Sequence, residues 1–74
     1  MKIKVGDLVN VRPHLAGDAH SFLRAKSIMI LESRVGIVTG QVVNADGYYD
    51  VLINCTGKII FTSYANLEVI NESR

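Results

Sequence analysis

The strongest constraint on the fold comes from residues 34–63, RVGIVTGQVVNADGYYDVLINCTGKIIFTS. β-branched and aromatic residues dominate this stretch, and the pairs Asp46-Gly47 and Thr56-Gly57 interrupt it at about ten-residue spacing. This pattern predicts three β-strands joined by two hairpins. Side chains alternate along the middle strand, and the face predicted to be core carries Tyr49, Val51, Ile53 and Cys55.

Three further features extend the predicted sheet. Gly40 interrupts the first of the three strands, where a missing side chain permits a bulge or bend that lets one strand serve both halves of a curled sheet. Upstream, a Leu- and Val-rich run predicts a strand over about residues 7–12 that Pro13 ends, because proline cannot donate to the ladder. Downstream, residues 63–70 predict one turn of 3-10 helix followed by a closing strand.

The length of 74 residues leaves room for one domain, which we expect to span residues 1–70, with a polar tail at 71–74. The hydrophobic fraction is 49% against 20% charged residues, a balance that favours a domain hiding some surface in a partner. The N-terminus lacks the apolar core of a signal peptide, and the single Cys55 excludes an internal disulfide. These features predict a protein of the cytoplasm that does not engage a membrane.

The order of these parts resembles the small barrels of the Src-homology-3-like (SH3-like) type. The segments that carry the resemblance are VGDLVNVR, VGIVTGQVV, YYDVLIN, GKIIF and LEVI. Similar patterns occur in KOW-containing ribosomal and transcription proteins, in a small peripheral photosystem I subunit and in short bacteriophage proteins. The KOW pattern is matched in part by Arg34, Gly36, Val38 and Gly40.

This resemblance implies an all-β fold, a five-stranded or six-stranded SH3-like barrel with a long first loop and one 3-10 turn before the last strand. It also suits a phage-encoded protein, located in the host cell interior or in the virion. Because barrels of this type host unrelated functions, the resemblance indicates a fold and not an activity.

The long first loop, residues 14–34, is too apolar to be an idle linker. Two arrangements would pack its apolar side chains. Phe22, Ala25, Lys26 and Met29 recur at helical spacing after possible caps at Asp18 and Ser21. Alternatively, residues 27–34 extend as a strand that adds a rung to the sheet. We favour the extended arm for 27–34, with a turn or short helix before it.

Candidates for chemistry are few. His14, Asp18 and His20 are of types that ligate zinc, but their spacing is not a recurrent zinc signature and Cys55 lies on a distant strand. We therefore predict no metal and no other cofactor. The sequence also lacks a nucleophile elbow, a Gly-rich phosphate loop and a dinucleotide fingerprint, so that we expect no enzyme activity.

Aromatic side chains are the best candidates for contact with a partner. In the barrels that this chain resembles, a groove between the first loop and the second hairpin is where aromatic residues meet a peptide or a nucleobase. The resemblance places Tyr48, outward on its strand, and Tyr64, on the 3-10 turn, at such a groove. The alternative is that Tyr49 and Phe61 are core residues and that Tyr48 covers the edge of the sheet.

We predict a non-catalytic binding or assembly module that contacts another protein, or a second copy of itself, through loop 14–34 and its outward aromatics. The predicted contact residues are Phe22, Met29, Tyr48, Tyr64, Arg12, Arg34 and Lys58. The alternative is a KOW-like nucleic-acid-binding barrel that uses Arg12, Arg24, Lys26, Arg34 and Lys58. A net charge of +1 without any block of like charge lacks the electrostatic footprint of a general nucleic-acid binder.

Overall fold

The computed structural model describes residues 3–19, 26–42 and 46–70. This part of the chain is all-β. Its elements are β1 (Leu8–Val11), β2 (His14–Asp18), β3 (Ser27–Ile30), β4 (Arg34–Gln41), β5 (Tyr48–Ile53), β6 (Ile59–Ser63), the 3-10 turn η2 (Tyr64–Asn66) and β7 (Leu67–Val69). Within the described ranges, no helix has the length and apolar character that crossing a membrane requires.

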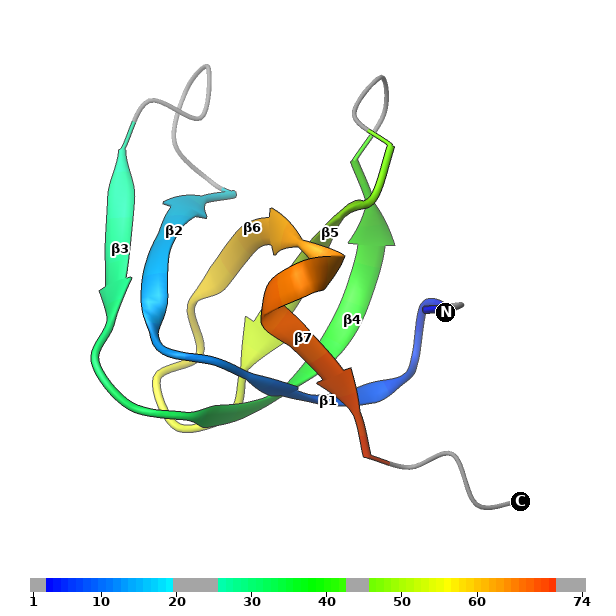
Figure 1. Cartoon of the computed structure of the whole chain (residues 1–74), viewed down its shortest axis with the longest axis horizontal. Helices are drawn as coiled ribbons and strands as arrows, with labels where there is room; N and C mark the ends of the chain where they lie inside the picture. The colour runs from blue at the N-terminus through cyan, green and yellow to red at the C-terminus, as the bar shows by residue number, and fades with distance from the viewer. Residues whose placement is uncertain (1–2, 20–25, 43–45, 71–74) are drawn as a thin grey trace.

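All seven strands belong to one antiparallel sheet with the order β3-β2-β6-β5-β4-β1-β7. The sheet curls, and η2 packs between the end of β6 and the start of β7 on its concave side (Figure 1). The two end strands, β3 and β7, do not pair with each other, so that the sheet is open. The sheet has seven strands, so that the predicted count of five or six strands is wrong.

The additional strands come from the long first loop. Residues 14–34 hold β2 and β3, which pair in a continuous register from His14↔Ile30 to Gly17↔Ser27. The extended arm predicted for residues 27–34 is confirmed over β3, whereas the strand β2 was not predicted. The helical alternative is wrong at Met29, which lies in β3. Lys26 is also not in a helix, and the other two positions, Phe22 and Ala25, lie outside the described residues.

The three strands and two hairpins predicted for residues 34–63 are confirmed as β4, β5 and β6. The register of β4 against β5 shifts between Val38 and Gly40, which is the bulge predicted at Gly40. Gly47 and Gly57 adopt positive φ angles of 82° and 72° in the two hairpin turns. β-turns with such angles favour glycine because it carries no Cβ.

The predicted first strand and the predicted 3-10 turn with its closing strand are confirmed as β1, η2 and β7. The Ser63 hydroxyl accepts a hydrogen bond from the Ala65 amide and so caps η2. β7 then pairs with β1 on the side away from β4, from Val9↔Val69 to Val11↔Leu67. One strand, β1, thereby joins the C-terminal segment to the rest of the sheet.

One hydrophobic core lies inside the curl. Its buried side chains are those of Ile3, Val9, Val11, Ala16, Ile30, Val38, Val51, Ile53, Ile60 and Leu67. The predicted core face of β5 is confirmed at Val51 and Ile53, and Tyr49 packs against the core. The prediction was wrong at Cys55, which is exposed. β5 ends at Ile53, and the chain turns there because Gly57 N–H donates to the Ile53 carbonyl.

Candidate functional site

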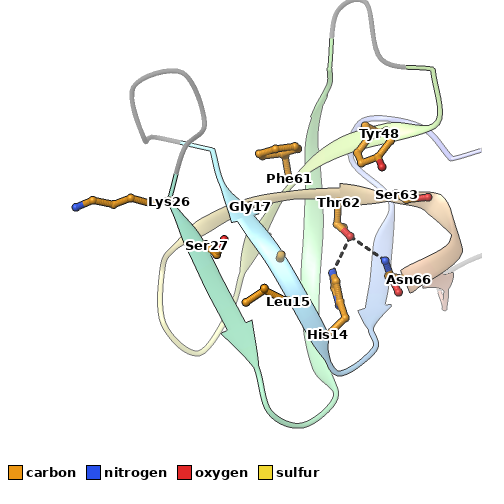
Figure 2. Close-up of a pocket in the computed structure, with 11 residues that line it drawn as sticks. His14, Leu15, Gly17, Lys26, Ser27, Tyr48, Phe61, Thr62, Ser63 and Asn66 are labelled. Carbon is orange, nitrogen blue, oxygen red and sulfur yellow. Dashed lines mark hydrogen bonds between the residues drawn. The ribbon is translucent and has the colours of Figure 1, made fainter.

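A groove lies where the β2–β3 hairpin approaches β6 and η2. It has a volume of about 290 Å³. The residues that line it are His14, Leu15, Ala16, Gly17, Lys26, Ser27, Tyr48, Phe61, Thr62, Ser63 and Asn66. Figure 2 shows Phe61 and Tyr48 at one end and His14 and Leu15 at the other. Together these residues form the groove.

The aromatic end of the groove is formed by two rings from neighbouring strands. The centroids of Tyr48 and Phe61 lie 6.2 Å apart, with their planes inclined by 48°. Phe61 also covers Gly17, where an added Cβ would lie 2.0 Å from a ring carbon. Tyr48 is exposed, as predicted, whereas Phe61 is half-buried and is not part of the hydrophobic core. The alternative that made Phe61 a core residue is therefore wrong.

A chain of hydrogen bonds forms the polar end of the groove. Nε2 of His14 lies 2.7 Å from the Thr62 hydroxyl, and Nδ2 of Asn66 donates to the same hydroxyl at 3.2 Å (Figure 2). Nδ1 of His14 lies 2.6 Å from the Arg12 carbonyl oxygen. A carbonyl oxygen only accepts, so that Nδ1 carries the proton; in the neutral ring, Nε2 then accepts from the Thr62 hydroxyl.

These bonds tie three elements together. His14 begins β2, Thr62 lies in β6 and Asn66 ends η2, so that the Thr62 hydroxyl joins all three. Thr62 is only 4% exposed, which leaves water little access to replace a lost partner. The polar end of the groove is therefore held by contacts within the protein.

Replacing Thr62 by valine is expected to lower the free energy of unfolding by about 1–3 kcal/mol, since both His14 and Asn66 would lose a partner beside a buried position. Urea denaturation followed by circular dichroism measures the change. Thr39→Val is the matched control, because the Thr39 hydroxyl makes a single exposed bond, to the Asp50 carbonyl. Equal stability of the two variants would contradict a structural role for the Thr62 hydroxyl.

Tyr64 and Met29 are exposed but lie outside the groove lining. Tyr64 lies on η2 beside Gly47, whose carbonyl accepts from the Tyr64 amide at 2.7 Å. Met29 is opposite Leu15 on the β2–β3 hairpin. Phe22, the remaining apolar residue in the predicted contact set, lies outside the described residues.

The predicted rim cations do not gather in one place. Arg12 donates from its guanidinium to the Ala65 carbonyl at 3.0 Å, and so holds η2 against the end of β1. Arg34 lies 3.3 Å from the Glu32 carboxylate. Arg34 and Lys58 border a second pocket of about 210 Å³, whose apolar lining includes Ile28, Ile30, Ile53 and Ile60. Arg24, named in the nucleic-acid alternative, lies outside the described residues.

Two of the three residues of zinc-ligating type lie on one strand, β2. His14 and Asp18 stand at the two ends of β2, about 13 Å apart at the usual rise per residue, and His20 lies outside the described residues. Among the residues that the structure describes, no three His, Cys, Asp or Glu side chains form a group that could hold a metal ion. The sequence did not indicate three residues of the groove: Thr62, Asn66 and Gly17. Only the fold brings them to His14 and Phe61.

Comparison with known proteins returns no match: no family model fits the chain, and neither a curated protein nor a solved structure matches it.

Proposed function

We propose that this chain is a small SH3-like barrel that acts as a non-catalytic binding module and holds an extended segment of another protein in the groove. The strand order supports the barrel type: β4 pairs with both β1 and β5, and β7 returns to β1 after a 3-10 turn. The long excursion between β1 and β4, which forms β2 and β3, also agrees with the order of segments that carries the resemblance.

The observation that carries the proposal is the composition of the groove. Two aromatic rings at one end offer flat apolar area at low entropic cost, and hydroxyl, imidazole and amide groups lie at the other end. Its volume of about 290 Å³ is at the lower limit of the roughly 300–1,000 Å³ typical of small-molecule sites. A groove of this size suits one or two side chains of an extended peptide.

The geometry around Thr62 supports a non-catalytic role. A hydroxyl 2.7 Å from an imidazole nitrogen is the distance expected of a nucleophile and its base. The Thr62 side chain is buried, however, and its oxygen also accepts from Asn66. The hydroxyl is therefore engaged on both sides, by His14 and by Asn66.

Selection from a display library of random peptides tests the proposal. Peptides enriched on the purified chain should bind in the groove, so that Tyr48→Ala weakens binding by about tenfold or more, as expected for a central aromatic contact. Fluorescence anisotropy with one enriched peptide gives the Kd of each variant.

Tyr64→Ala is the matched control, because Tyr64 is an exposed tyrosine outside the groove lining. Its Kd should stay within about twofold of the unmodified chain. Failure to enrich any peptide, or an equal loss in both tyrosine variants, would contradict the groove as the binding site.

Salt dependence distinguishes the nucleic-acid alternative. Contacts with phosphate weaken steeply as salt concentration rises, whereas an apolar peptide contact changes little. Binding of a single-stranded oligonucleotide that falls steeply with salt and is lost in Arg34→Ala and Lys58→Ala variants, without peptide binding in the groove, would replace the proposed function by that alternative.

A further inference from the structure

The open edge at β3 carries no charged side chain, no proline and no bulge, three features by which proteins protect such edges. β3 is the last strand of the sheet, and its residues Ser-Ile-Met-Ile carry no charge and no proline. Edge strands are commonly protected by charged side chains, proline or a bulge. β3 has a continuous register with β2, and no strand of the described ranges pairs with its outer side. Its backbone is therefore suited to receive another strand.

The hydrogen-bond pattern shows which backbone groups face outward. The Asp18 amide donates to the Lys26 carbonyl at 3.0 Å, which makes these two residues a hydrogen-bonded pair. Hydrogen-bonded and non-hydrogen-bonded pairs alternate along an antiparallel ladder, so that Ile28 and Ile30 bond to β2. Ser27 and Met29 consequently direct their N–H and C=O groups toward the open edge.

We propose that β3 pairs with β3 of a second copy of this chain, antiparallel and centred on Met29. The segment around β3 is self-complementary: Lys26-Ser27-Ile28-Met29-Ile30-Leu31-Glu32 runs from a cation through five uncharged residues to an anion. A two-fold axis at Met29 sets the following residues opposite each other in the two copies: Met29 and Met29, Ile28 and Ile30, Ser27 and Leu31, Lys26 and Glu32.

Charge selects this register among the possible ones. With Met29 at the centre, Lys26 faces Glu32 of the second copy at both ends of the paired strands, and opposite charges across a strand pair are favourable. A shift of two residues in one direction would set Lys26 against Arg34, which is unfavourable. A shift in the other direction would set Lys26 against Ile30, so that no opposite charges would face each other across the strands at this position. The centred register is also isologous and closes as a dimer.

Exposed apolar side chains lie where the pairing would cover them. Met29 is 57% exposed and its neighbour on β2, Leu15, is 61% exposed; Leu31, just beyond β3, is 82% exposed. In the centred register, the two Met29 side chains lie on the same face, flanked by the two Leu15 side chains. This interface shares Leu15, Lys26 and Ser27 with the lining of the groove, but Met29, at its centre, does not line the groove.

Sedimentation equilibrium tests the pairing on the full chain. The weight-average mass should rise from the monomer value of 8.1 kDa toward twice that value as concentration increases. Met29→Lys should keep the chain monomeric over the same range, because the substitution brings two ammonium groups together at the two-fold axis. Val5→Lys should leave association unchanged, because Val5 is exposed and precedes β1, with β4, β5, β6 and β2 between it and β3.

Charge exchange tests the register. Glu32→Lys and Lys26→Glu should each weaken self-association about fivefold or more, because each sets like charges opposite each other. An equimolar mixture of these two variants should associate more tightly than either one alone, because every facing pair is then of opposite charge. Circular dichroism checks that each of the two variants remains folded.

Three results would overturn the proposal: a monomer at all concentrations, association that survives Met29→Lys, or a mixture that associates no better than its components. Peptide binding in the groove is measured separately on Met29→Lys. A monomeric variant that still binds peptide shows that peptide binding does not require the pairing of two copies, and loss of peptide binding in Tyr48→Ala leaves the mass measurement unaffected.

Discussion

Replacing Ile60 by alanine is expected to lower the free energy of unfolding by about 2–5 kcal/mol. Ile60 is fully buried at 0% exposure and lies in β6, between Asp18 of β2 and Val51 of β5. Its side chain therefore fills the core where the β2–β3 hairpin joins the rest of the sheet. A single core in a domain of this size rarely supplies more than about 3–5 kcal/mol, so that the variant should be largely unfolded.

Urea denaturation followed by circular dichroism measures this loss at one fixed protein concentration, since self-association would make stability depend on concentration. Ile60→Val should cost about 0.5–1.5 kcal/mol, because it removes one methylene from the same site. Val5→Ala, at an exposed position, should stay within about 0.5 kcal/mol of the parent chain. A similar midpoint for Ile60→Ala and Val5→Ala would show that Ile60 does not support the core.

The hairpins of residues 34–63 were predictable because their information is local. Glycines in the two turns adopt positive φ angles, and alternation along β5 puts Val51 and Ile53 into the core. The prediction failed at Cys55 because alternation of side chains along a strand does not indicate where the strand ends. β5 stops two residues earlier, and Cys55 lies in the turn.

The strand β2 was not predictable because its sequence, His-Leu-Ala-Gly-Asp, has little intrinsic strand preference. The strand β2 is extended because it pairs on both sides: with β3 along its length, and with β6 at Gly17↔Phe61 and Asp18↔Ile60. Gly17 fits there because the Phe61 ring occupies the space that a side chain would need. These are contacts between distant segments, and no local pattern contains them.

The candidate site also has features that the sequence could predict and features that it could not. Outward placement of Tyr48 and Tyr64 follows from strand alternation and from the 3-10 turn, and both are exposed. The pairing of His14 with Thr62 joins residues that are 48 positions apart. It depends on the register of β2 and β6 and therefore had to come from the structure. The same holds for the open edge of β3, which exists only because the first loop forms a hairpin.

Gly36→Ala is expected to destabilise the protein by about 1–3 kcal/mol, the range found for overpacked cores. Gly36 is buried in β4, between Val9 of β1 and Ile53 of β5. A Cβ added there would lie 2.7 Å from the Leu52 carbonyl oxygen and 2.7 Å from a methyl carbon of Val51. The carbonyl belongs to the backbone of a paired strand and cannot turn aside as a flexible side chain can. β4 and β5 would have to separate locally, at the centre of the sheet.

Gly40→Ala is the matched control on the same strand. A Cβ at Gly40 would meet only Asp50 Oδ2, at the ordinary contact distance of 3.7 Å. Its φ angle is not in the left-handed region, so that alanine should be neutral or should stabilise by up to about 1 kcal/mol through a less flexible unfolded chain. The urea midpoint should therefore fall in Gly36→Ala and should stay the same or rise in Gly40→Ala. If Gly36→Ala were as stable as Gly40→Ala, β4 and β5 could not be paired as closely as Gly36↔Ile53 requires, and the register of the central hairpin would have to be revised.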